Sequence, residues 1–156
     1  GGGLPVGAYG GRREIMELIS PDGPAYQAGT LSGNPLAVAA GLAQLKELER
    51  NRGIYRRIES MAKDLAAGLS RLGLNVNRFG STLTPFFTKG PVTDWRSADR
   101  ADRKAHAKFF KGMLDRGIFL PPSQFEAMFL SAAHTGGDVD RTLRSAREVL
   151  RALHLG

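Results

Sequence analysis

The sequence predicts a short α/β segment, residues 1–50, followed by an α+β domain, residues 51–156, with a small and largely antiparallel sheet. Three observations lead to this prediction. The first 50 residues hold one apolar run bounded by glycines and one glycine-rich loop before a helix. The later residues interleave amphipathic helical patterns with short strand-like runs. A hydrophobic content of 42% is enough for a core.

The first segment begins with an apolar run at residues 4–9, which we expect to form a buried strand that ends in a turn at Gly10-Gly11. Residues 12–18 predict one or two helical turns. A loop rich in Gly, Ser and Thr follows at 28–35 and ends in Asn34-Pro35. Because Asn caps free amides and Pro fits the first helical position, a helix is expected from Pro35 to about Arg50.

Three amphipathic helices are predicted in the second segment. The first carries apolar residues at spacings of three and four from Ile54 to Leu72, and the glycine at position 73 ends it. The second covers about 100–116. Asp138 is expected to cap the third. The inner face of the second helix is predicted to hold Ala105, Phe109, Met113 and Leu114.

Short apolar or alternating runs between these helices predict strands. Residues 74–79 alternate with period two, as a half-buried strand does, and 83–88 are expected to pair with them. Two further strands are predicted at 118–120 and 127–132. Together they would make the antiparallel sheet.

Composition narrows the possible functions. Cysteine is absent, so disulfides and thiolate metal sites are excluded, and the three histidines lie far apart without ligand spacing. No apolar run approaches the roughly 20 residues that span a bilayer. The net charge of +7 allows a nucleic-acid-binding domain. The basic residues are, however, spread along the chain and mixed with acidic ones. We therefore favour another explanation of the positive charge: the chain is part of a longer protein, and the balancing acidic residues lie in the missing part.

The loop at 26–35 is the best candidate site on physical grounds. Glycines free the backbone amides, and a threonine hydroxyl and a helix start are close by, which suits a phosphate. Composition alone nevertheless favours an ordinary capped turn.

Longer motifs indicate a family. The runs GGGLPVGAYGG at 1–11 and YQAGTLSGNP at 26–35 strongly resemble class III aminotransferases. PSQFEA at 122–127 and AHT at 133–135 resemble the glutamate-1-semialdehyde aminomutases within that family. The resemblance covers essentially the whole chain, in order and with sensible spacing.

This resemblance implies part of a fold-type I enzyme dependent on pyridoxal 5'-phosphate or its pyridoxamine form. Such an enzyme is a cytoplasmic homodimer with its cofactor at the subunit interface. The aminomutases convert glutamate 1-semialdehyde to 5-aminolevulinate for tetrapyrrole synthesis. In the family the Schiff-base lysine lies just upstream of the Gly-Gly-Gly run, so we expect this chain to be a C-terminal part that begins after it.

The resemblance also assigns roles to residues. Gly29 and Thr30 match positions that contact the cofactor phosphate from the neighbouring subunit. Tyr26 matches a tyrosine near the partner's active-site entrance. Glu126 matches a glutamate close to the active-site lysine, where many aminotransferases keep an arginine for a substrate carboxylate. Ser123 would shape the same substrate-binding loop.

No lysine of this chain is expected to replace the upstream one, because a Schiff-base lysine needs burial or a cationic neighbour at a cleft. The chain alone is therefore expected to be inactive. Two alternatives remain open, an ordinary class III transaminase and, more distantly, a basic nucleic-acid-binding module.

Overall fold

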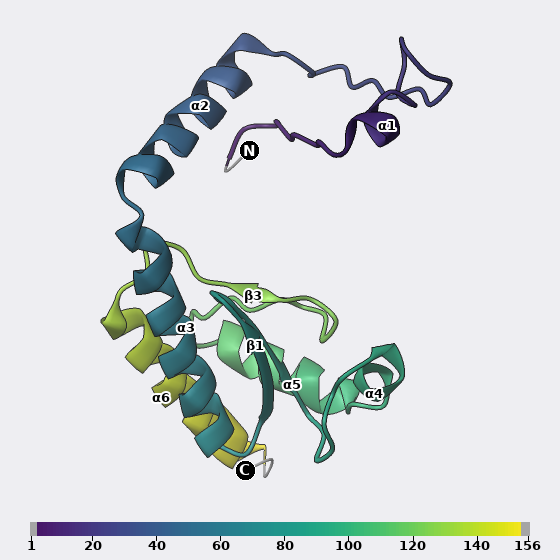
Figure 1. The fold of residues 1–156 in the computed structure, drawn as a ribbon. Helices are drawn as coiled ribbons and strands as arrows, with labels where there is room; N and C mark the ends of the chain where they lie inside the picture. Colours follow the sequence, from purple (N-terminus) through teal and green to yellow (C-terminus); the bar gives the residue numbers. More distant parts are fainter. Residues whose placement is uncertain (1–2, 154–156) are drawn as a thin grey trace. The chain divides into compact units, whose positions relative to one another are not determined.

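The computed structural model describes residues 3–153 and divides into two compact units, Gly1–Arg52 and Gly53–Gly156 (Figure 1). The first two glycines of the 1–11 motif and His154 lie outside the described residues. Within the described residues no helix is long and apolar enough to cross a membrane.

The described residues of the first unit contain two helices, α1 (Arg13–Met16) and α2 (Pro35–Arg50). The strand predicted at 4–9 is wrong: these residues form no ladder, and no turn forms at Gly10-Gly11. A strand needs a neighbour to pair with its amides and carbonyls, and the described part of this unit holds only one isolated bridge, Ile19 with Ala25.

Helix α2 forms over the predicted range because its start is encoded locally. The Asn34 side chain accepts a hydrogen bond from the Ala37 amide at 3.0 Å, and Pro35 occupies the first helical position. Ala37 is the only buried residue among those described in this unit, and four large apolar side chains of the helix are exposed: Leu36, Val38, Leu42 and Leu45.

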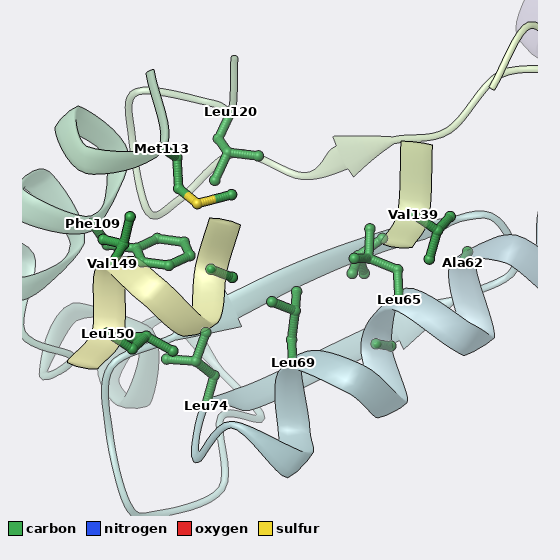
Figure 2. Close-up of a cluster of buried hydrophobic side chains, with 13 residues drawn as sticks. Ala62, Leu65, Leu69, Leu74, Phe109, Met113, Leu120, Val139, Val149 and Leu150 are labelled. Carbon is green, nitrogen blue, oxygen red and sulfur yellow. The ribbon is translucent and has the colours of Figure 1, made fainter. Parts of the chain in front are cut away.

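The second unit is built on three long helices, α3 (Gly53–Arg71), α5 (Arg103–Leu114) and α6 (Gly136–Ala152). Helices α3 and α6 lie side by side (Figure 1). Their apolar faces and that of α5 enclose one core, and Figure 2 shows the side chains that meet there, among them Leu65, Leu69, Phe109, Met113, Val149 and Leu150. Burial of these side chains is the main stabilising contribution to this unit.

The sheet is antiparallel, as predicted, with the order β1 (Asn75–Phe79), β2 (Thr82–Phe86) and β3 (Met128–Phe129). Thr82 pairs with Phe79 on one side and with Phe129 on the other. The run at 127–132 contributes only the two residues of β3. No strand forms at 118–120, because the Ile118 amide instead donates to the Met113 carbonyl at 3.0 Å and closes α5.

Three helix predictions need correction. A short helix, α4 (Trp95–Asp99), precedes α5, and α5 begins at Arg103 behind the cap Asp102. On α5, Leu114 is 41% exposed, whereas His106 lies on the buried face. The cap of α6 is Thr135 rather than Asp138; Asp138 is the third helical residue, and its carboxylate completes a capping box by accepting from the Thr135 amide at 2.8 Å.

Candidate functional site

The residues predicted to contact the cofactor lie in the first unit, on the exposed turn before α2. The Ser32 amide donates to the Gly29 carbonyl at 2.9 Å, and the Asn34 amide donates to the Leu31 carbonyl at 3.0 Å. A Cβ atom at position 29 would stand 3.0 Å from the Ser32 hydroxyl oxygen, so a larger residue there would require the Ser32 side chain to move. Tyr26 lies just before the turn with 82% of its surface exposed.

Thr30 has two donors that fit a phosphate group. It is exposed, and among the described residues neither its amide nor its hydroxyl has a hydrogen-bond acceptor. Two such donors on one residue can bind an oxyanion together. The turn is thus compatible with the predicted phosphate contact.

The other predicted residues, Ser123 and Glu126, lie in the second unit on a tight loop between α5 and β3. The Glu126 amide donates to the Ser123 carbonyl at 3.2 Å, and the Phe125 amide donates to the Ser123 hydroxyl at 3.2 Å. The Thr84 hydroxyl of β2 donates to the Glu126 carbonyl at 3.4 Å. These bonds bring Ser123 and Glu126 together and leave the Glu126 side chain exposed.

Glu126 lies at the edge of an apolar cavity of about 640 Å³. Its walls come from α3, the segment 118–122, β3 and the start of α6. Asp138 and His134 also line it, at the capping box of α6. The Asp138 hydrogen bonds with Thr135 hold the pKa of that carboxyl below 3.8, so it is ionised at neutral pH.

Two buried polar side chains are associated with this loop: Gln124 is part of it, and His106 of α5 lies beside it. Gln124 is only 3% exposed, and its Nε2 donates to the Ala98 carbonyl of α4 at 3.2 Å. His106 is 7% exposed and lines a small cavity with Ser123 and Glu126. Burial lowers the pKa of His106; the Pro121 and Pro122 carbonyls oppose this, although neither forms a hydrogen bond of normal geometry with the ring.

On the outer side of the loop, Phe125 packs between Trp95 and Arg103. The ring centroids of Trp95 and Phe125 are 4.7 Å apart, and the Arg103 guanidinium carbon is 5.1 Å from the Phe125 centroid. Sequence reasoning missed this support and the role of His106. One signal was available: His106 lies three residues before Phe109, on the same helical face.

All six lysines, at positions 46, 63, 89, 104, 108 and 111, are exposed, and none lines the cavities beside Glu126. No group of three or more metal-binding side chains gathers within residues 3–153.

Comparison with known proteins gives the family. The aminotransferase class-III profile matches residues 1–130. A glutamate-1-semialdehyde 2,1-aminomutase of Thermus thermophilus is 56% identical over 96% of this chain and 37% of the relative. The relative of that name from Desulfitobacterium hafniense is 54% identical over 98% of this chain and 37% of its own length. The chain thus spans about 37% of these relatives, and the resemblance to aminomutases is confirmed.

Solved structures agree on the fold. An omega-transaminase from Sphaerobacter thermophilus matches 97% of this chain and 36% of its own, with a TM-score of 0.78 and 26% identity. A beta-phenylalanine aminotransferase from Variovorax paradoxus matches 93% of this chain and 35% of its own, with a TM-score of 0.73 and 26% identity. The predicted fold class, part of a fold-type I transferase, is confirmed. The chain belongs to the class-III aminotransferase family.

Proposed function

We propose that the protein containing this chain converts glutamate 1-semialdehyde to 5-aminolevulinate. The observation that carries this proposal is an identity of 51–56% to relatives named as this aminomutase, over nearly all of the chain. The exposed Glu126 on a braced loop at a cavity edge supports it from the structure.

Pyridoxal phosphate, or its pyridoxamine form, is the proposed cofactor, and when bound it supplies an electron sink for bond changes at the substrate carbon. Gly29 and Thr30 would hold its phosphate: the Thr30 amide and hydroxyl each donate one hydrogen bond to the dianion. The resemblance assigns this contact to the neighbouring subunit, so the proposed enzyme is a homodimer. The division into residues 1–50, from the cofactor-binding domain, and residues 51–156, the small domain, belongs to the same proposal.

Glu126 is the proposed catalytic group of this chain. A carboxylate at this place repels a substrate carboxylate and favours an amino group, which suits a reaction that moves an amino group within one molecule. Ser123 and Tyr26 are proposed to contact the substrate. Because all six lysines are exposed, we infer that residues 1–156 alone are inactive and that an upstream lysine completes the site.

An ordinary class III transaminase is the second candidate, and the transaminase names of the structural neighbours favour it. The two functions differ in whether the amino group leaves the molecule. A transaminase needs an external 2-oxoacid or amino acid at every turnover, whereas an aminomutase needs neither.

The intact protein that contains residues 1–156, loaded with pyridoxamine phosphate, is the material for the test. We expect it to form 5-aminolevulinate from glutamate 1-semialdehyde without any added amino donor or acceptor. Glu126→Gln should lower kcat by about a hundredfold. Glu148→Gln, an exposed glutamate of α6 outside the cavity, is the matched control and should leave the rate unchanged. Turnover that depends on an added 2-oxoacid would establish the transaminase instead.

A further inference from the structure

The loop that carries Glu126 is attached to α4 by a side chain that sequence reasoning gave no separate role. Gln124 is the one residue of the run 123–126 that is buried. Its Nε2 donates to the Ala98 carbonyl, 26 residues earlier in the chain, and among the described residues its buried Oε1 has no hydrogen-bond partner. Glutamine is mostly found exposed, and here a buried glutamine uses its side-chain donor to contact a distant segment.

The next residue of the loop, Phe125, contacts the same helix. Phe125 points outward and packs on Trp95, the first residue of α4. Arg103 covers the Phe125 ring and also forms an ion pair with Asp99, the last residue of α4. Consecutive side chains of the loop, one buried and one exposed, therefore both end on α4.

Helix α4 is itself fixed. Asp94 and Ser97 form a capping box at its start, and the Asp102 amide after it donates to the Phe87 carbonyl beside β2 at 3.0 Å. Ala98 also packs against the small core of Phe86, Val92 and Ala101. A loop attached to such a support has few positions open to it.

We propose that Gln124 is a positioning residue for Glu126: its bond to α4, backed by the Phe125 stack, holds the loop so that the Glu126 carboxylate stays at the edge of the cavity. This inference rests on the proposed role of Glu126 and adds what places that carboxylate. Gln124 itself touches no reacting group; it acts through the backbone that runs from Ser123 to Glu126.

Gln124→Met tests this in the intact protein, because methionine keeps the length of the side chain and removes the donor. Ser145→Ala is the matched control: it changes another buried polar residue of the same unit, on α6 and away from the loop. Deuterium exchange gives a readout that needs neither substrate nor cofactor. We expect the Phe125 and Glu126 amides to exchange faster in Gln124→Met but not in Ser145→Ala, while α6 amides stay unchanged in Gln124→Met.

Kinetics give the second readout. Gln124→Met should lower kcat about tenfold with little change in KM. The Glu126 carboxylate acts on substrate that is already bound, so its displacement slows the reaction step and leaves binding unchanged. In a Glu126→Gln background the same substitution should change kcat by less than about twofold, since no carboxylate remains to be placed. A tenfold loss that recurs in that background would overturn the proposal.

The outcomes separate the two proposals. Unchanged exchange at 125–126 in Gln124→Met overturns the positioning role, whatever reaction the protein catalyses. Faster exchange at 125–126 would support the positioning role. If the kinetic coupling between Gln124 and Glu126 were then found in a transaminase reaction, the positioning role would stand and the aminomutase function would be rejected.

Discussion

At the scale of single residues, His106 shows how burial changes chemistry. Its ring lies on the buried face of α5, edge-on to Phe87 with the centroids 6.3 Å apart. Burial disfavours the imidazolium, so the pKa of His106 lies below its usual 6.5 in the folded protein. The unfolded chain therefore binds a proton at higher pH than the folded chain does. The stability that the neutral ring contributes is fully present above pH 6.5 and is lost as pH falls towards the folded pKa.

His106→Gln should remove this dependence, because glutamine does not titrate. We expect the unfolding free energy of the wild type, measured by urea titration, to fall as pH drops below 6.5, and that of the variant to change less. Asp94 and Asp138 do not contribute in this range, since their hydrogen bonds keep both pKa values below 3.8. Equal slopes in His106→Gln and wild type would contradict the assignment.

At the scale of elements, two helix pairs approach each other at glycines within the helices. A Cβ atom at Gly68 of α3 would stand 2.4 Å from Leu143 of α6, and one at Gly112 of α5 would stand 2.7 Å from Val149 of α6. Leu143 is half-buried and can turn aside, whereas Val149 is 2% exposed and stiff at its branched Cβ. The α5–α6 contact is thus the less tolerant of the two.

Gly112→Ala should destabilise the protein although alanine is the better helix former. Alanine gains about 1 kcal/mol in helix propensity, but overpacking against Val149 costs about 1–3 kcal/mol, for a net loss of about 1 kcal/mol. Thermal or urea unfolding measures it. Gly136→Ala, at the first residue of α6, where a Cβ atom would meet no atom within 4 Å beyond its chain neighbours and its own helix backbone, is the control for a methyl group added without a clash. Combined with Val149→Ala, Gly112→Ala should cost less than it does alone; simple additivity would contradict the steric account.

At the scale of the whole molecule, the two units differ in what they bury. Both hydrophobic clusters lie within Gly53–Gly156, while the described residues of Gly1–Arg52 bury only Ala37. Hydrophobic burial is the dominant favourable term in folding. The second unit therefore has what it needs to fold by itself, and the first does not.

Residues 53–156 expressed alone should unfold in one cooperative transition, followed by circular dichroism, whereas residues 1–52 alone should show none. Leu69→Ala, in the core of α3, should lower the unfolding free energy of the fragment by about 2–5 kcal/mol, and this would show that the native core has formed. The exposed Tyr55→Ala on the same helix is the control. A non-cooperative fragment would mean that the core needs the first unit.

For most features that neighbouring residues decide, the sequence was sufficient; the cap of α6, expected at Asp138 and found at Thr135, is the exception. The cap Asn34 and Pro35 set the start of α2, the face from Ile54 to Leu72 sets the buried side of α3, and glycines with positive φ end α3 and α5. The family was also readable, since long motifs survive in order. These features depend on residues within a few positions of one another.

Tertiary structure decided most of the rest, because most of the partners involved lie far apart along the chain. Residues 4–9 and 118–120 both have strand-like sequences. The first run pairs with no neighbouring strand among the described residues, and in the second the Ile118 amide donates to the Met113 carbonyl of α5. His106 becomes buried only when the loop at 121–126 covers α5, and Gln124 meets Ala98 only after α4 forms. The sequence by itself determined the family, the ranges of α2 and α3, and the residues of the candidate site. The support that holds the Glu126 loop came from tertiary packing, because a contact between distant residues leaves no local pattern in the sequence.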